Sequence, residues 1–157
     1  GDSMKKFFYV SFFFSFFLLG CATKTFKPVK TEIVKKAPRL SKNKIYDKAM
    51  KWFSTEFVSN DKKIERADKK EGTIIATGSA LLSGKLIKKM MEFQIRVDIK
   101  RGRYKVSTTI KKYKDEISKG IFRVPAATED RVSSGNKYTK EMAKSLHKFI
   151  TKKDKKW

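Results

Sequence analysis

The stretch KMMEFQIRVDIK at residues 89–100 decides the fold, because its apolar and polar side chains alternate one by one from Met91 to Lys100. Successive side chains of a strand point to opposite faces of a sheet, so this alternation predicts a strand with one buried and one solvated face. The dipeptide Arg101-Gly102 suits a tight turn, and RYKVSTTIKK at residues 103–112 resumes the alternation. The two stretches therefore predict a long antiparallel hairpin. Its predicted inward side chains are Met91, Phe93, Ile95, Val97, Ile99, Tyr104, Val106, Thr108 and Ile110.

Four further elements are expected before this hairpin. Residues 31–34, TEIV, are β-branched enough for a short edge strand. Ser41 is a typical helix N-cap, and the apolar residues after it recur at helical spacing. The spacing then changes to two, which predicts a weak strand at residues 62–68 and a strong strand at residues 73–82. The apolar helix positions are Ile45, Ala49, Trp52, Phe53 and Phe57.

The segment of residues 113–136 has no clear period. Its composition predicts loop at residues 114–116 and 132–136, with residues 121–124 as either an extra strand or an apolar plug. A loop of this length without structure is unusual in a compact domain, so we expect part of it to pack or move. From Asn136 the spacing predicts a final helix. Its apolar face would carry Tyr138, Met142, Leu146, Phe149 and Ile150.

The expected order is β-α-β-β-β-β-α, and three segments within it resemble a known family. IYDKAMKWF at residues 45–53, EGTIIATG at 71–78 and VDIKRGRY at 97–104 are similar to a bacterial lipoprotein family. That family is described as a domain of unknown function with a TATA-binding-protein-like (TBP-like) fold, and the resemblance covers roughly residues 25–112. It implies an α+β fold, a curved antiparallel β-sheet with helices packed on one face. It also implies a secreted, usually lipid-anchored protein with no assigned activity and no catalytic residue.

Cys21 is the only cysteine of the chain, and it follows a basic start at residues 4–6 and an apolar run at residues 7–19. This order is typical of a bacterial lipoprotein signal, which is cut before the cysteine after its sulfur has received a diacylglyceryl group. We expect residues 1–20 to be removed and Cys21 to be lipidated. The alternative, a retained membrane helix, fits less well because the 18 residues from Met4 to Cys21 fall short of the roughly 20 that a span needs.

The expected location is therefore the bacterial cell envelope, with a membrane as the first partner. The absence of Asp directly after Cys21 favours the outer membrane under the sorting rule of enteric bacteria. We expect a lipidated cysteine and basic tether at residues 21–30, a single TBP-like α+β domain at 31–150, and a basic tail at 151–157. Removal of residues 1–20 takes away two lysines and one aspartate, so the net charge of +23 becomes +22.

Enzyme chemistry is not expected. His147 is the only histidine, and Cys21 is spent on the anchor, so neither a histidine-based metal site nor a Ser-His-Asp arrangement is indicated. Glu92 and Asp98 share one strand face but would stand about 20 Å apart at strand rise, too far for a carboxylate pair. We therefore expect no catalytic residue, no metal ion and no cofactor.

The charge points instead to an anionic partner, because 39 Lys and Arg stand against 16 Asp and Glu. The predicted solvated face of the hairpin carries Arg96, Lys100, Arg103 and Lys105, which are our candidate anion-facing residues. They favour a non-catalytic binding or interaction module for an anionic envelope lipid or glycan. The alternative for any single lysine is a solvated surface charge without a ligand.

Two other functions are weighed beside this one. The first is a structural accessory subunit of an envelope assembly, docking another envelope protein through residues 32–34 or 121–124. The second is nucleic-acid binding by analogy with the fold, which we disfavour because export removes the partner. The outward face of the hairpin also offers few aromatic side chains on which bases could stack.

Overall fold

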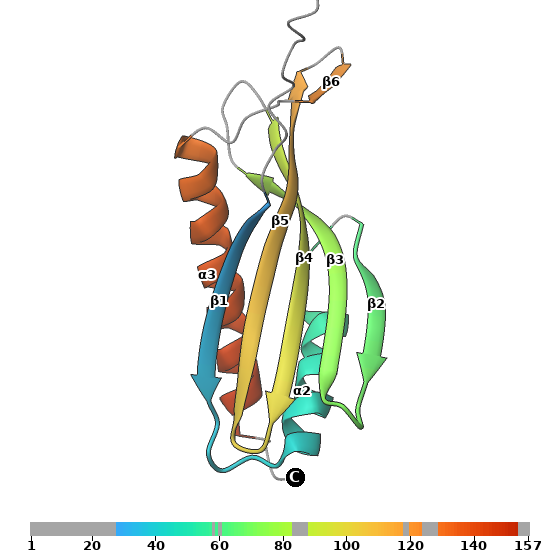
Figure 1. The fold of residues 1–157 in the computed structure, drawn as a ribbon, viewed down its shortest axis with the longest axis vertical. Helices are drawn as coiled ribbons and strands as arrows, with labels where there is room; N and C mark the ends of the chain where they lie inside the picture. The colour runs from blue at the N-terminus through green and yellow to red at the C-terminus, as the bar shows by residue number, and fades with distance from the viewer. Residues whose placement is uncertain are drawn as a thin grey trace, which may run out of the picture.

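The computed structural model describes residues 28–57, 59, 61–82, 88–117, 120–123 and 129–153. It has one six-stranded antiparallel sheet, in which β1, β5, β4, β3 and β2 lie in this order and β6 pairs with β5. Two helices cover one face of the curved sheet (Figure 1). The elements are β1 (Val29–Lys36), α2 (Lys42–Thr55), β2 (Lys63–Asp68), β3 (Thr73–Leu82), β4 (Lys88–Lys100), β5 (Arg103–Ile117), β6 (Gly120–Arg123) and α3 (Glu129–Thr151).

Helix α2 begins and packs as its sequence predicts. The Ser41 side chain accepts a hydrogen bond from the Lys44 backbone N–H at 3.2 Å, which satisfies one of the free donors of the first turn. The five predicted apolar positions are all buried, with at most 3% of any side chain exposed. Trp52 also donates from Nε1 to Ser145 Oγ at 3.1 Å, which joins α2 to α3.

The long hairpin β4–β5 builds the floor of the core. Its nine predicted inward side chains are at most 2% exposed, whereas Arg96 and Lys100 of β4 and Arg103 of β5 are exposed. Burial of each large apolar side chain stabilises the fold by roughly 1.5–3 kcal/mol. The predicted α+β fold, with helices on one face of an antiparallel sheet, is confirmed.

The prediction for residues 113–136 was largely wrong. Strand β5 continues to Ile117, so residues 114–116 are strand, and residues 120–123 form β6, which confirms the extra-strand interpretation for that part. Helix α3 begins at Glu129 rather than at Asn136, so the loop expected at residues 132–136 is helical.

Tertiary packing explains why this weak helical sequence folds as a helix. Gly135 faces the sheet so closely that a Cβ there would lie 2.7 Å from Tyr113 Oη and 2.9 Å from Ile110 Cδ1. Thr31 Oγ1 of β1 also donates to Asn136 Oδ1 at 3.3 Å. Contact with the sheet therefore outweighs the poor helix propensity of Ser, Gly and Asn, which is a weak preference at each residue.

Several sequence predictions lie outside the described residues. They are the signal peptide at residues 1–20, Cys21 with the tether as far as residue 27, Val124, and the last four residues of the tail. Within the described part, no helix is both long enough and apolar enough to cross a membrane.

Candidate anion-binding site on the helix-free face

Strand register brings three cations side by side on the face of the sheet that the helices leave open. Lys36 of β1 stands opposite Arg103 of β5, and Arg103 stands opposite Lys100 of β4. All three residues are exposed. Like charges directly opposite each other on neighbouring strands destabilise a sheet, so this row carries an electrostatic cost that a bound anion would relieve.

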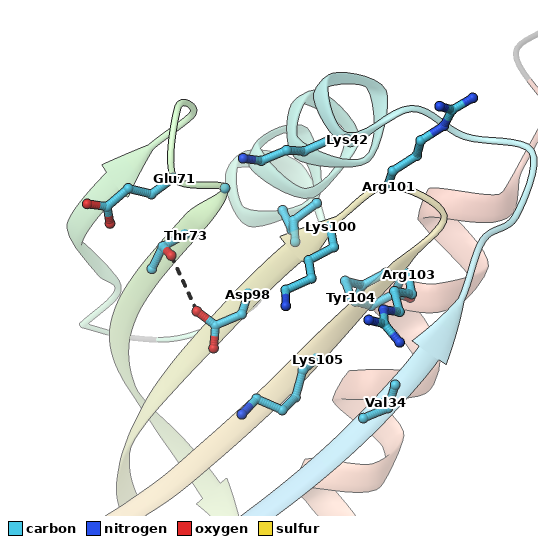
Figure 2. Close-up of a pocket in the computed structure, with 12 residues that line it drawn as sticks. Val34, Lys42, Glu71, Thr73, Asp98, Lys100, Arg101, Arg103, Tyr104 and Lys105 are labelled. Atoms are coloured by element: carbon cyan, nitrogen blue, oxygen red, sulfur yellow. Dashed lines mark hydrogen bonds between the residues drawn. The ribbon is translucent and has the colours of Figure 1, made fainter.

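Lys100 and Arg103 of this row line a hollow of about 660 Å³ at the end of the sheet. Figure 2 shows Lys100, Arg103 and Lys105 over the strands, with Lys42 of α2 and Glu71 of the β2–β3 turn around them. Within the hollow, Thr73 Oγ1 donates to Asp98 Oδ1 at 3.3 Å. The charged lining residues are Lys42, Lys100, Arg101, Arg103 and Lys105 against Glu71 and Asp98, so positive charge exceeds negative.

Two glycine turns set the shape of this hollow. Gly102, at the tip of the β4–β5 hairpin, has φ +70° and accepts a hydrogen bond from the Ala37 N–H at 2.7 Å. Gly72 has φ +82°, and its carbonyl accepts from the Ile99 N–H at 2.7 Å. These left-handed conformations favour glycine, because other residues pay a steric cost there. The turns therefore hold the cationic strand ends in fixed positions.

The four candidate residues lie on one face as predicted, but the structure divides them into two kinds. Arg96 donates from Nε to both Asp98 oxygens, at 2.9 and 3.0 Å, and Lys105 Nζ lies 3.6 Å from Glu32 Oε1. Lys100 and Arg103 form no ion pair with any described residue. Lys100 and Arg103 are therefore the pair available to a ligand, while Arg96 and Lys105 mainly balance carboxylates.

Glu32 shows the effect of this basic surface on a carboxylate. Its Oε1 lies 2.8 Å from Lys30 Nζ, and this contact, followed by the charge of Lys105, holds the pKa of Glu32 below its usual range. The carboxylate is exposed, so the pair contributes little to stability. The Glu32 carboxylate also balances part of the positive charge of Lys105.

Lys36 of the row and two cations that line the hollow, Lys42 and Arg101, were not among the candidates drawn from the sequence. Lys36 belongs to the row only through the pairing of β1 with β5. Lys42 reaches the site from α2, where its Nζ donates to the Lys70 carbonyl at 2.6 Å. Arg101 sits in the hairpin turn. The only sequence signal for the open face was the alternation along the two hairpin strands. That alternation covers neither the hairpin turn nor β1 and α2.

His147 packs against the sheet rather than lining this site. Its Nδ1 lies 2.9 Å from Tyr104 Oη, and burial, followed by the charge of Lys35, lowers the pKa of His147. The imidazole is therefore neutral at pH 7 and joins α3 to β5. Among the described residues, no group of three or more His, Cys, Asp or Glu side chains could hold a metal ion.

The architecture defines the class of protein first: an antiparallel sheet with helices on one face, a TBP-like fold. Residues 31–114 match the family described as "Domain of unknown function (DUF4468) with TBP-like fold", and the chain belongs to this family. The segments that resembled it in sequence lie within this range.

Two solved structures share the fold. A TBP-like protein from Parabacteroides distasonis is 10% identical with a TM-score of 0.62, over 81% of this chain and 95% of that one. A DUF4468 family protein from Bacteroides ovatus is 16% identical with a TM-score of 0.58, over 88% of this chain and 92% of that one. No curated protein matches the chain significantly in sequence.

Proposed function

We propose that the chain is a lipid-anchored envelope protein that binds an anionic ligand, without catalysis, on the helix-free face of its sheet. The observation that carries this proposal is the row Lys36, Arg103 and Lys100, three neighbouring exposed cations beside a hollow. A phosphate or carboxylate group placed over the row would replace repulsion between the cations with attraction to each of them.

Lys100 and Arg103, which form no ion pair with any described residue, have side chains that suit phosphate. The planar guanidinium of Arg103 can donate two parallel hydrogen bonds to one phosphate, and Lys100 adds a mobile point charge beside it. Neither side chain would have to break an ion pair with a carboxylate of the described residues before it binds a ligand, unlike Arg96 and Lys105. A phosphorylated or carboxylated lipid headgroup or glycan therefore suits the site. The proposed envelope location also favours a ligand of this kind.

The binding proposal is tested by calorimetric titration of the detergent-solubilised chain with pyrophosphate at low salt. We expect saturable binding that weakens as the salt concentration rises, because exposed charges are screened. A neutral disaccharide is the matched control and should give no signal. Absence of pyrophosphate binding at low salt would contradict the proposal.

The alternative of a structural accessory subunit requires an exposed apolar patch. The large apolar side chains that are exposed in the described residues are Val34, Ile64 and Leu81, with 62%, 41% and 54% of their surface open. They lie on three different strands, β1, β2 and β3, and β1 and β2 form opposite ends of the five-strand order. Apolar residues scattered in this way need no partner, so anion binding is the better supported function.

Nucleic-acid binding has less support still. In the described parts of β1 to β5, the helix-free face carries no aromatic side chain, since Phe93, Tyr104 and Tyr113 are buried on the helix side. Binding of single-stranded nucleic acid usually relies on stacking of bases on aromatic rings.

The anchor is tested separately through Cys21. Chain isolated from a bacterial membrane fraction should begin at Cys21 and carry the added mass of its acyl groups, as measured by mass spectrometry. The Cys21→Ala variant should keep its signal and lack that mass. An unmodified Cys21 in a chain that retains residues 1–20 would contradict the lipoprotein assignment.

A further inference from the structure

A second basic hollow, of about 370 Å³, lies at the end of the molecule where β1 finishes. The segment after β1, helix α2 and the end of α3 all contribute to it. Its charged lining residues are Lys36, Arg39, Lys48, Lys152 and Lys153, and its apolar lining residues are Ala37, Pro38, Leu40 and Ile150. Among the described residues, no carboxylate lines this hollow.

Two backbone hydrogen bonds connect the chain segments that form the two hollows. The Ala37 N–H donates to the Gly102 carbonyl at 2.7 Å, and the Gly102 N–H donates to the Leu40 carbonyl at 3.2 Å. These bonds fix the β1–α2 connection to the tip of the β4–β5 hairpin, and Figure 1 shows both beside the C-terminal end of α3. Lys36 belongs to both sites, since it lines the second hollow and stands opposite Arg103 of the first.

The negative C-terminal end of α3 offsets only part of the positive charge of the second hollow. The last carbonyls of a helix carry about half a negative charge, and Lys48 Nζ already donates to the Lys152 carbonyl at 2.5 Å. Lys36, Arg39 and Lys153 form no ion pair with any described residue, and neither do Lys100 and Arg103 of the first hollow. One small anion cannot compensate exposed cations that are spread over two hollows.

We propose that the two hollows form one continuous site for an extended polyanion, a chain that carries phosphate or carboxylate groups at regular intervals. This inference rests on the proposed anion-binding function and specifies its ligand class. The first anionic group lies over Lys100 and Arg103, and the following groups pass Lys36 to reach Arg39 and Lys153.

The test compares pyrophosphate with linear polyphosphate of about ten units, whose binding to several cations should fall more steeply with salt. The variant Arg39→Gln/Lys153→Gln removes two cations of the second hollow and leaves the first intact. We expect its affinity for polyphosphate to fall roughly tenfold, about 1.4 kcal/mol, and its affinity for pyrophosphate to stay within about twofold. The matched control Lys51→Gln/Lys144→Gln removes two exposed lysines of the helix layer and should change neither affinity.

The outcomes separate this inference from the proposed function. If pyrophosphate binds but the Arg39→Gln/Lys153→Gln variant keeps full affinity for polyphosphate, the continuous site is wrong and the single-anion site stands. If neither probe binds at low salt, both proposals fail. An oligothymidylate of equal charge should bind no more tightly than polyphosphate, and tighter binding would replace the inference with nucleic-acid recognition.

Discussion

Replacing both Lys100 and Arg103 by glutamine is expected to lower the affinity of the chain for pyrophosphate roughly tenfold at low salt. A hydrogen bond to a charged group contributes about 1.5–3 kcal/mol, but both side chains are exposed, so screening by solvent reduces the joint loss to about 1.4 kcal/mol. Titration calorimetry of the two proteins side by side measures this change.

The double variant should not unfold the domain. Removal of two of three neighbouring cations relieves repulsion across β1, β5 and β4, so the thermal midpoint should stay the same or rise. The variant Lys51→Gln/Lys144→Gln loses the same net charge from the helix layer. An equal loss of affinity in this control would show that total charge, rather than the row, governs binding.

The Trp52→Ala variant is expected to lose about 3–5 kcal/mol of unfolding free energy, the range for deletion of a large buried aromatic side chain. The Trp52 side chain is only 2% exposed, and its ring centroid lies 5.1 Å from that of Phe53 and 5.3 Å from that of Phe57. Its indole N–H also bonds to Ser145 of α3. Denaturant unfolding followed by circular dichroism measures the loss.

Trp52→Phe is the matched control for this change. It keeps an aromatic ring in the same space and removes the bond to Ser145, so it should cost clearly less than Trp52→Ala. A loss below about 1 kcal/mol for Trp52→Ala would contradict the account of α2 and α3 as one packed layer, because such a value is typical of surface positions.

Strict alternation made the hairpin the most predictable part of the fold. Each apolar residue from Met91 to Ile99 points to the core because a strand has only two faces and one of them is covered. Helix α2 was equally readable, since a local cap at Ser41 and a local spacing define it. Predictions that rest on neighbours in the sequence were confirmed here.

The N-terminal half of α3 could not be predicted in this way. Its residues have low helix propensity, and the helix is held by contacts with distant parts of the chain, such as Gly135 against Tyr113 and Asn136 against Thr31. The extension of β5 beyond residue 112 has a similar origin, because β6 pairs with its end. These contacts depend on the tertiary structure and leave no periodic signal.

For the candidate site, the sequence predicted which residues share the open face but not which of them form ion pairs. Alternation placed Arg96, Lys100, Arg103 and Lys105 on the open face, but only the three-dimensional structure shows that Asp98 and Glu32 engage two of them. The contribution of Lys36 depends on the register of β1 against β5, which joins residues 67 positions apart in the chain.

The most direct test of the account is a pyrophosphate titration of the detergent-solubilised chain followed by the NMR shifts of its backbone amides. The account predicts that the shifts concentrate at Lys36 and at residues 100–105, and that amides on the outer side of α3, such as that of Lys144, stay in place. Shifts centred on the helix layer, or spread evenly over the lysines of the chain, would contradict a binding site on the helix-free face.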